Sequence, residues 1–337
     1  MTIGPVTNSH REISVTEPVS PALERVKTML FKPFDLGKWF TIGFCAWLAF
    51  LGEGGSGSGG FNNTFNNNFN TNNGGSAGES FRHTYHQARD YVMNNLDWII
   101  PAAAGAVILL LALWLLILWF SSRGKFMFLH CVALDKAEVG VPWSKFGREA
   151  NSLFWFRLVL SLISMVLMLP MLGFIVLLVV RMVLRGEPDV GGIMAALGIG
   201  VVFFLLAIVF ALINKFTEDF VVPIMFLRGG KCMAAWREFL GLLRLHAGML
   251  TLYILFQILL SMAIGIIVLV ALVLTCCFCC LALVPYIGTV VVLPVLVFKR
   301  SYPLYFLRQF GPQYDVFPPE PAPPGPSVAG LQPPPGV

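Results

Sequence analysis

Hydrophobic positions along this chain fall into long uninterrupted runs that are separated by shorter polar segments. Five runs are clear, and they cover residues 98–120, 158–180, 191–213, 248–268 and 281–298. An apolar run of about 20 residues is the length that a helix needs to cross about 30 Å of hydrocarbon. The pattern therefore predicts an all-α, polytopic membrane protein.

A further run at residues 34–52 comes first in the chain and is shorter than the others. Only 14 residues separate Lys38 from Glu53, which corresponds to about 21 Å of helix. This run crosses a membrane if the helix includes residues 34–37 and the Lys38 side chain extends to the interface. It also lacks a small-residue cleavage site, so we expect an anchor rather than a signal peptide. With it, we predict six transmembrane helices.

The overall composition agrees with a membrane protein. Apolar residues make up 57% of the chain and charged residues 12%, and the mean hydropathy is +0.76. Soluble domains carry about twice this charged fraction. The net charge of +5 needs no nucleic-acid partner, because basic residues flank membrane spans for reasons of orientation.

Basic residues concentrate in every second connection between the predicted spans. They are frequent in both terminal segments and in the connections at 121–157 and 214–247. The other connections hold Arg82 and Arg89, then Arg181 and Arg185, then no charged residue. Connections rich in Lys and Arg stay in the cytoplasm. Six spans with both termini cytoplasmic satisfy every segment.

Polar, low-complexity sequence lies outside the predicted spans. We predict a membrane domain over residues 20–312, preceded by a disordered arm at 1–19 and followed by a Pro-rich disordered tail at 313–337. The predicted external loop at 53–97 is rich in Gly and Asn. Such a tract buries too little apolar surface to offset its chain entropy, so we expect it to be disordered.

The cytoplasmic connections share a short amphipathic pattern. WSKF leads into the third predicted span and WREF into the fifth, and apolar positions recur at helical spacing in both. A third version lies before Pro33, with Ser20 as its expected N-cap. We expect these helices at the lipid interface, through Trp143, Phe146, Trp236, Phe239, Arg237 and Arg244.

A similar Phe-rich segment follows the second, fourth and sixth predicted spans, which suggests an internal repeat. The three segments are FSSRGKFMFLHCVALDKA, NKFTEDFVVPIMFLRGG and VFKRSYPLYFLRQFG. They predict a pseudo-repeated domain of three units, each with about two spans.

This layout, with GKWFTIGFCAWL and FVVPIMFLRGGKCMAAWREF, resembles an uncharacterised family of bacterial six-span membrane proteins. That family is distantly similar to the membrane domain fused to some glycerophosphodiester phosphodiesterases. The resemblance covers roughly residues 15–312, and implies a fold and a location in the bacterial inner membrane. It brings no catalytic residues, because the phosphodiesterase chemistry belongs to a separate soluble domain.

Two clusters are candidates for metal or redox chemistry. Glu79, His83, His86 and Asp90 would share one face of a helix and suit a zinc-like ion. A solvated polar face explains the same spacing and is the favoured interpretation. The cluster TCCFCC holds Cys276, Cys277, Cys279 and Cys280. Thiols that fill an apolar turn are favoured there over a metal or disulfide role. We therefore predict no cofactor.

The apolar cores of the second to sixth predicted spans contain no Asp, Glu, Lys or Arg. Gln257 is the strongly polar side chain in their middle, and we expect it to bond another helix. Coupled transporters need intramembrane charges, and the sequence has no enzyme or nucleic-acid motif. We therefore expect a non-enzymatic scaffold or accessory subunit whose partners are membrane lipids and, on the cytoplasmic face, a protein. The alternative is a passive facilitator or lipid-handling permease, which a polar cavity near Gln257 would favour.

Overall fold

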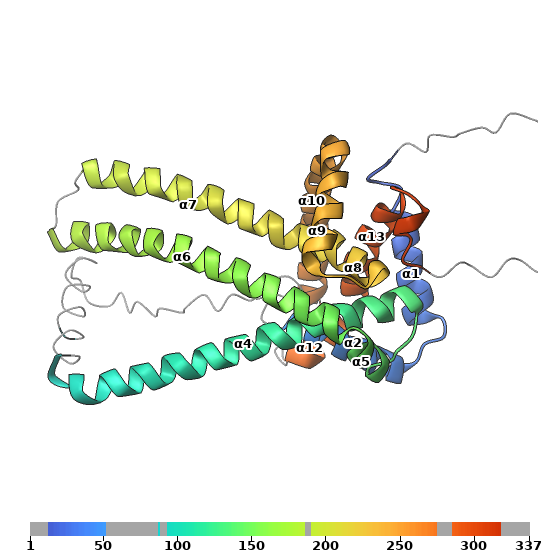
Figure 1. Cartoon of the computed structure of the whole chain (residues 1–337), viewed down its shortest axis with the longest axis horizontal. Coiled ribbons are helices and arrows are strands. Elements are labelled where there is room, and N and C mark those ends of the chain that lie inside the picture. Colours follow the sequence, from blue (N-terminus) through green and yellow to red (C-terminus); the bar gives the residue numbers. More distant parts are fainter. Residues whose placement is uncertain (1–12, 52–86, 88–92, 186–189, 275–284, 318–337) are drawn as a thin grey trace, which may run out of the picture.

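The chain folds into helices that form a compact body, from which three long helices project (Figure 1). The structure is a computed structural model and describes residues 13–51, 87, 93–185, 190–274 and 285–317. The α-helices are α1 (Val19–Phe31), α2 (Leu36–Ala49), α4 (Leu96–Leu134), α5 (Gly140–Lys145), α6 (Gly147–Arg185), α7 (Val190–Phe216), α8 (Val222–Arg228), α9 (Cys232–Leu245), α10 (Ala247–Leu274), α12 (Pro285–Val291) and α13 (Leu293–Arg308). A π-helix η1 (Thr217–Val221) and a 3₁₀ turn η2 (Pro312–Tyr314) complete them. These residues contain no strand.

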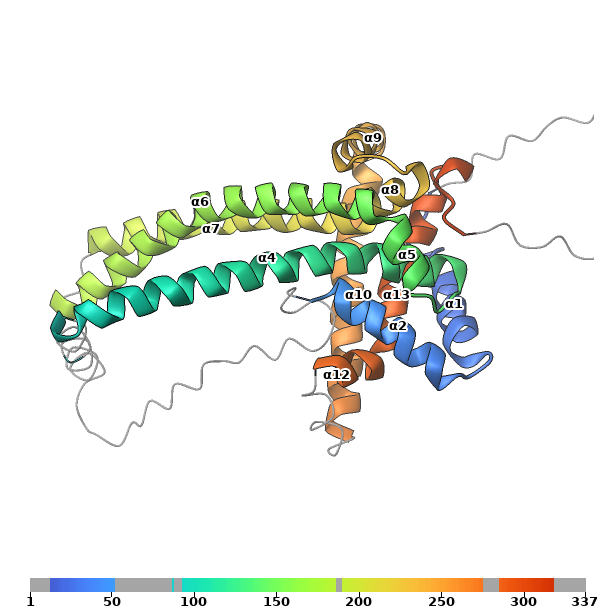
Figure 2. The same ribbon diagram turned by 60° about the horizontal axis from the view of Figure 1, so that its bottom comes forward.

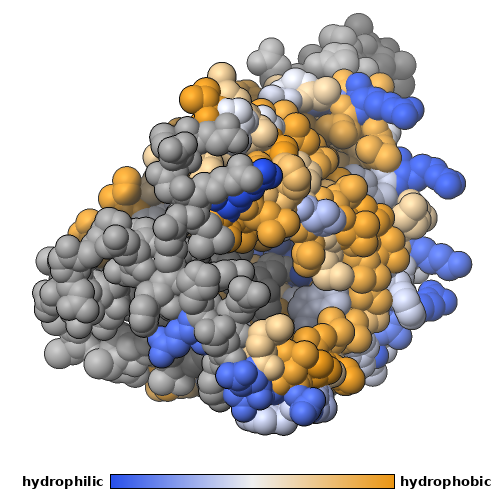
Figure 3. Space-filling model, turned by 90° about the vertical axis from the view of Figure 1, so that its left-hand side faces the viewer, coloured by the Kyte–Doolittle hydropathy of each residue, from blue (hydrophilic) through white to orange (hydrophobic). Residues whose placement is uncertain are grey.

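The projecting helices α4, α6 and α7 carry apolar side chains on all sides. None of the residues in their most apolar stretches is buried, although the mean hydropathy there reaches 2.6 to 3.0. Figure 3 looks onto their tips and shows apolar side chains over much of the described surface. Water does not support so large an apolar surface, whereas lipid does. The protein is therefore embedded in a membrane.

Among the described residues, four helices are long and apolar enough to cross a bilayer. They are α4, α6, α7 with its continuation to Arg228, and α10. In the two views of Figures 1 and 2, α10 runs across the shared direction of the other three. The structure thus describes four candidate spans rather than six, and they do not form one parallel bundle.

The first and sixth predicted spans are shorter in the structure. The first corresponds to α2, whose 14 residues cover about 21 Å and pack against the inner part of α4. In the predicted sixth span, residues 281–284 lie outside the described residues, and the remainder is divided at Val292 into α12 and the start of α13. Pro294 has no N–H to donate, which favours a new helix start at this point.

The core of the compact body comes from the Phe-rich segments that follow the spans. In α4, side chains turn from exposed to buried at Ser121, and residues from 124 to 133 are buried. The His130 ring of the first segment lies against Phe226 of the second with centroids 6.3 Å apart, and Phe220 of the second lies against Phe306 of the third at 6.1 Å. The three Phe-rich segments therefore meet in one core. Whether they are repeats stays a prediction.

Helix α2 lies unusually close to α4. A Cβ atom at Gly124 would meet backbone atoms of Leu48 and Ala49, closer than Cβ atoms come in proteins. Behind this contact, the buried thiols of Cys45 and Cys131 lie 3.8 Å apart. A glycine is thus required where the two backbones approach.

A buried hydrogen-bond chain attaches α10 to the body. The Tyr253 hydroxyl donates to Asp219 Oδ2 at 2.9 Å, and Gln257 Nε2 donates to the Tyr253 hydroxyl at 3.0 Å. Asp219 belongs to η1, and its carboxylate also pairs with Lys215 Nζ at 3.0 Å. The bond shown for Gln257 is to a residue of its own helix instead of the expected other helix, and Tyr253 is the residue that reaches η1.

The two ends of the described chain lie together. The Ser14 amide donates to Gln309 Oε1 at 2.7 Å, and Gln309 Nε2 donates back to the Ser14 carbonyl at 2.9 Å. The Tyr302 hydroxyl donates to the Val15 carbonyl at 2.8 Å. The segment before α1 and the end of α13 are therefore on the same side of the molecule.

Replacing Gly124 with Ala tests the close approach of α2. We expect Gly124→Ala to destabilise the protein by about 1–3 kcal/mol, because the new methyl group forces two backbones apart. Gly105→Ala is the matched control in the same helix, since its Cβ would meet nothing within 4 Å. Thermal unfolding in detergent measures both. Equal melting temperatures for the two variants would show that α2 does not pack in this way.

Removing the Tyr253 hydroxyl tests the attachment of α10. We expect Tyr253→Phe to cost about 1–3 kcal/mol, because the buried Asp219 carboxylate loses a donor that water does not replace. Tyr286→Phe is the control, since the Tyr286 hydroxyl donates to the Phe40 carbonyl at an exposed site. Urea unfolding in detergent compares them. A cost for Tyr253→Phe no larger than that of the control contradicts the role of this bond.

Candidate functional site

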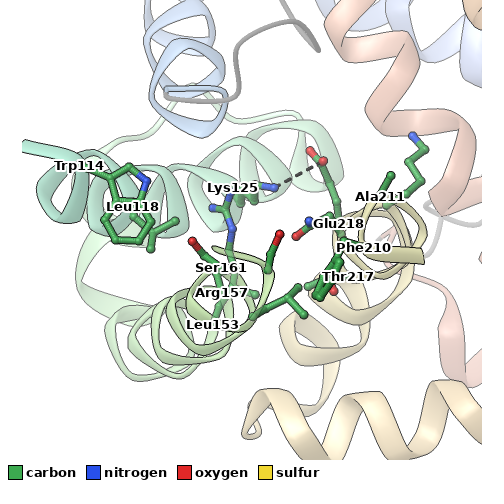
Figure 4. A pocket seen from close by; sticks show the side chains of 14 residues that line it. Trp114, Leu118, Lys125, Leu153, Arg157, Ser161, Phe210, Ala211, Thr217 and Glu218 are labelled. Atoms are coloured by element: carbon green, nitrogen blue, oxygen red, sulfur yellow. Dashed lines mark ion pairs between the residues drawn. The ribbon is translucent and has the colours of Figure 1, made fainter. Parts of the chain in front are cut away.

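A cavity of about 490 Å³ opens where the three long helices leave the compact body. Its apolar walls come from the inner ends of the candidate spans, and its polar groups come from α4, α6, α7 and η1 (Figure 4). The lining side chains are Trp114, Leu118, Lys125, Leu153, Arg157, Leu160, Ser161, Ser164, Phe210, Ala211, Asn214, Lys215, Thr217 and Glu218. This volume falls within the usual range for small-molecule sites.

An ion pair crosses one end of the cavity. Lys125 Nζ of α4 lies 3.4 Å from Glu218 Oε2 of η1, and the two side chains are 6% and 20% exposed. Arg300 of α13 donates from Nη1 to the Glu218 carbonyl at 2.9 Å. Three elements far apart in the sequence therefore meet at this charged floor, with the packed core behind it.

Arg157 of α6 forms a second polar connection at the same level. Its Nη1 donates to Ser121 Oγ of α4 at 3.1 Å, and that hydroxyl donates to the Ala49 carbonyl at 2.9 Å. The chain of bonds links α6, α4 and the end of α2. It also turns the guanidinium toward the cavity, close to Lys125 (Figure 4).

Two consecutive acids of the π-helix η1 serve different partners. Glu218 pairs with Lys125 of α4, whereas Asp219 pairs with Lys215 and accepts from Tyr253 of α10. A π-helical turn contains an additional residue, and such turns are frequent at functional sites. η1 thereby joins the cavity to the attachment of α10.

Positive charge exceeds negative charge in this region. Lys125, Arg157 and Lys215 line the cavity, whereas the lining contains one carboxylate, that of Glu218. Lys299 of α13 interacts electrostatically with Lys215 and Glu218 of this site. Burial lowers the pKa of the Lys299 ammonium, and the positive charge of Lys215 lowers this pKa further. The cavity is therefore suited to an anion. Among the described residues, no group of three or more His, Cys, Asp or Glu could hold a metal ion.

An apolar groove continues from the cavity along α4. A second cavity of about 250 Å³ shares Trp114, Leu118 and Arg157 with the first. Its other lining residues are Leu51, Leu110, Leu113 and Ile117. Polar and apolar parts thus adjoin in one elongated site.

The structure separates the predicted interface residues into two groups. Phe146 and Phe239 are buried in the core. Trp143 and Trp236 are half-buried, and Trp143 covers the Arg123 guanidinium at 4.8 Å. Arg237 and Arg244 are exposed on α9. Phe146 and Phe239 therefore act in packing, while lipid contact by the remaining four stays a prediction.

One detail of the predicted amphipathic helices is wrong. Ser20 does not cap α1, because the helix begins at Val19 and has no side-chain cap bond.

The predicted metal and thiol clusters lie outside the described residues. This applies to Glu79, His83, His86 and Asp90, and to Cys276, Cys277, Cys279 and Cys280. Gln257 is described and is buried, but it does not line the cavity.

Sequence reasoning missed the cavity because its charges lie at the ends of the spans. Lys125 and Lys215 lie in connections between spans, where basic residues are expected because they set the orientation in the membrane. Arg157 directly precedes an apolar run. The available signal is the pair Glu218–Asp219, which stands in a segment where basic residues outnumber acidic ones. Acids at such a position indicate that nearby cations are paired inside the protein.

Comparison with known proteins gives a family and no function. No curated protein and no solved structure matches the chain. The model of a family of unknown function (DUF7544) matches residues 13–285, which include α1 to α10 and all residues that line the cavity. The match covers most of the chain, so the protein belongs to this family of unknown function.

Proposed function

We propose that the protein is a non-enzymatic membrane scaffold or accessory subunit that holds a lipid at the inner end of its spans. The observation that carries this proposal is the cavity between α4, α6 and α7, which ends at the Lys125–Glu218 ion pair. Phe126 and Leu153, both fully buried, belong to the packed core at this end. A site with this shape retains a ligand.

The runner-up function is a lipid-handling permease or passive facilitator. The observation that favours it is the continuous polar and apolar lining of the two cavities, which an amphiphile could follow along α4. Against it, Gln257 lies in a buried bond chain instead of a cavity in mid-membrane. Holding a lipid therefore has the stronger support.

The charge pattern of the connections supports six membrane crossings with both termini cytoplasmic. The pair α6 and α7 leaves the body and returns (Figures 1 and 2), which agrees with two of these crossings. The bonds between Ser14 and Gln309 hold the two ends of the described chain on one side of the molecule, as an even number of crossings requires.

The charges of the compact body support its location on the cytoplasmic side. Its connections hold the Lys- and Arg-rich segments, which remain in the cytoplasm of bacteria. The proposed compartment is the bacterial inner membrane. The likeness to the membrane domain fused to some glycerophosphodiester phosphodiesterases belongs to the same proposal, and rests on the motifs of the sequence.

Helix α9 is the proposed docking element of the body for the inner leaflet or a protein. Arg237 and Arg244 are exposed on it, while Phe239 anchors it in the core. Basic side chains near an anionic membrane surface contribute about 1 kcal/mol each.

Reporter fusions test the proposed topology. Fusions after Lys136, Lys231 and Gln313 should report the cytoplasm, and fusions after Ser76 and Ala282 the outside. The Ala282 position decides whether α10 crosses the membrane. An inside signal at Ser76 would remove the first span, and one at Ala282 would remove the fifth and sixth.

Charge reversal on α9 tests docking. We expect Arg237→Glu with Arg244→Glu to change the set of neighbours that crosslink to the protein in cells, because the exposed positive face becomes negative. Arg237→Lys with Arg244→Lys is the charge-matched control and should keep the wild-type neighbours. If the reversed variant also keeps them, α9 has a structural role alone.

A further inference from the structure

We infer that the cavity between α4, α6 and α7 binds the phosphate-bearing headgroup of an anionic phospholipid, whose acyl chains lie along α4. The inference rests on the proposed function, because it assumes that the site holds a lipid, and it adds the chemical class of that lipid. The charge of the site, its donors, its apolar continuation and its depth support the inference.

The charge of the site calls for an anion. Lys125, Arg157 and Lys215 contribute three positive charges to the lining and Glu218 one negative charge. Behind the lining, Asp219 adds a negative charge, and Arg300 and Lys299 add positive charges. Positive charges therefore exceed negative charges in this region beside the apolar spans. A phosphate diester carries the opposite charge and is attracted to such a site.

The donors of α6 match a phosphate group. Arg157, Ser161 and Ser164 follow at helical spacing, so that all three lie on one face of α6 and line the cavity. Lys125 faces them from α4 (Figure 4). A guanidinium binds phosphate oxygens through two parallel N–H bonds, and hydroxyl groups add further donors. An ammonium on the opposite wall completes a site for a tetrahedral anion.

The apolar continuation of the cavity points to a lipid as the source of the phosphate. Trp114 and Leu118 line both cavities, and the groove beyond them is lined by leucine and isoleucine side chains except at Arg157. A free phosphate ion gains nothing from this groove, whereas an acyl chain gains about 0.8 kcal/mol for each buried CH₂.

The depth of the site agrees with a headgroup. In α4, no residue of the most apolar stretch is buried, and burial begins at Ser121, one turn before Lys125. Arg157 directly precedes the predicted span at 158–180. The cationic groups thus lie where the hydrocarbon region ends. Basic pockets between spans at the cytoplasmic side bind anionic headgroups in this way.

Native mass spectrometry of the purified full chain tests the inference. Protein in nanodiscs of phosphatidylglycerol and phosphatidylcholine is transferred to detergent and delipidated stepwise. We expect about one phosphatidylglycerol per chain to remain after phosphatidylcholine is lost. Arg157→Gln should weaken this retention about tenfold, because a charge-assisted contact to phosphate is lost. Arg148→Gln is the control in the same helix, since its side chain is 87% exposed.

A second variant covers the case in which Arg157→Gln does not fold. Ser161→Ala with Ser164→Ala keeps all charges and removes two donors, and should also weaken retention of phosphatidylglycerol. The comparison of the two lipids on the unmodified chain needs no variant at all.

The possible results separate the inference from the proposed function. Equal retention of both lipids, unchanged in Arg157→Gln, would overturn the anionic headgroup and leave lipid holding intact. Loss of both lipids at the same step would overturn both. A parallel titration with inorganic phosphate distinguishes the source of the anion. Displacement of phosphatidylglycerol at millimolar phosphate would overturn the lipid in favour of a free ion, whereas resistance supports it.

Discussion

The ion pair between Lys125 and Glu218 marks the level at which lipid-facing helices give way to a packed protein core. At this level α4 and α7 stop facing lipid and begin to pack against protein. Apolar helices gain little from packing on one another within hydrocarbon, because lipid is as apolar as their side chains. The contacts that define this fold therefore lie inward of the spans, where polar groups and aromatic rings pack together.

Two close approaches make this inner region rigid. Gly124 lets α2 reach the backbone of α4, and Tyr253 joins α10 to the π-helix through Asp219. Both contacts sit beside the cavity, since Ser121 links α2 to Arg157 and Asp219 follows Glu218. The cavity is thus framed by groups that also hold the fold. Arg157 and Glu218 are thus connected to the contacts that attach α2 and α10.

The features that suggest a function for this molecule lie at the boundary between its lipid-facing spans and its packed core. The excess of positive charge and the hydroxyl groups of α6 are located there, and the apolar groove leads away from them along α4. The exposed arginines of α9 belong to the same compact body. The cations of the cavity would attract an anionic lipid, and the exposed arginines of α9 would attract an anionic membrane surface. Both attractions agree with the proposal that the compact body docks on the inner leaflet.

Local sequence features predict that this is a helical membrane protein, where its longest apolar helices lie, and which connections are basic. These features depend on local hydropathy and on length, because a run of about 20 apolar residues has the length and composition of a helix that crosses a membrane. The amphipathic α9 was also predictable, because its periodicity is local. By contrast, the shortness of α2, the crosswise path of α10 and the cavity depend on contacts between distant residues. Lys125, Arg157 and Glu218 lie on three different helices, and each reads alone as an ordinary charge at the end of a span. Only the tertiary structure places them around one space, because the Coulomb and packing terms that join them act through space and leave no periodic pattern in the chain.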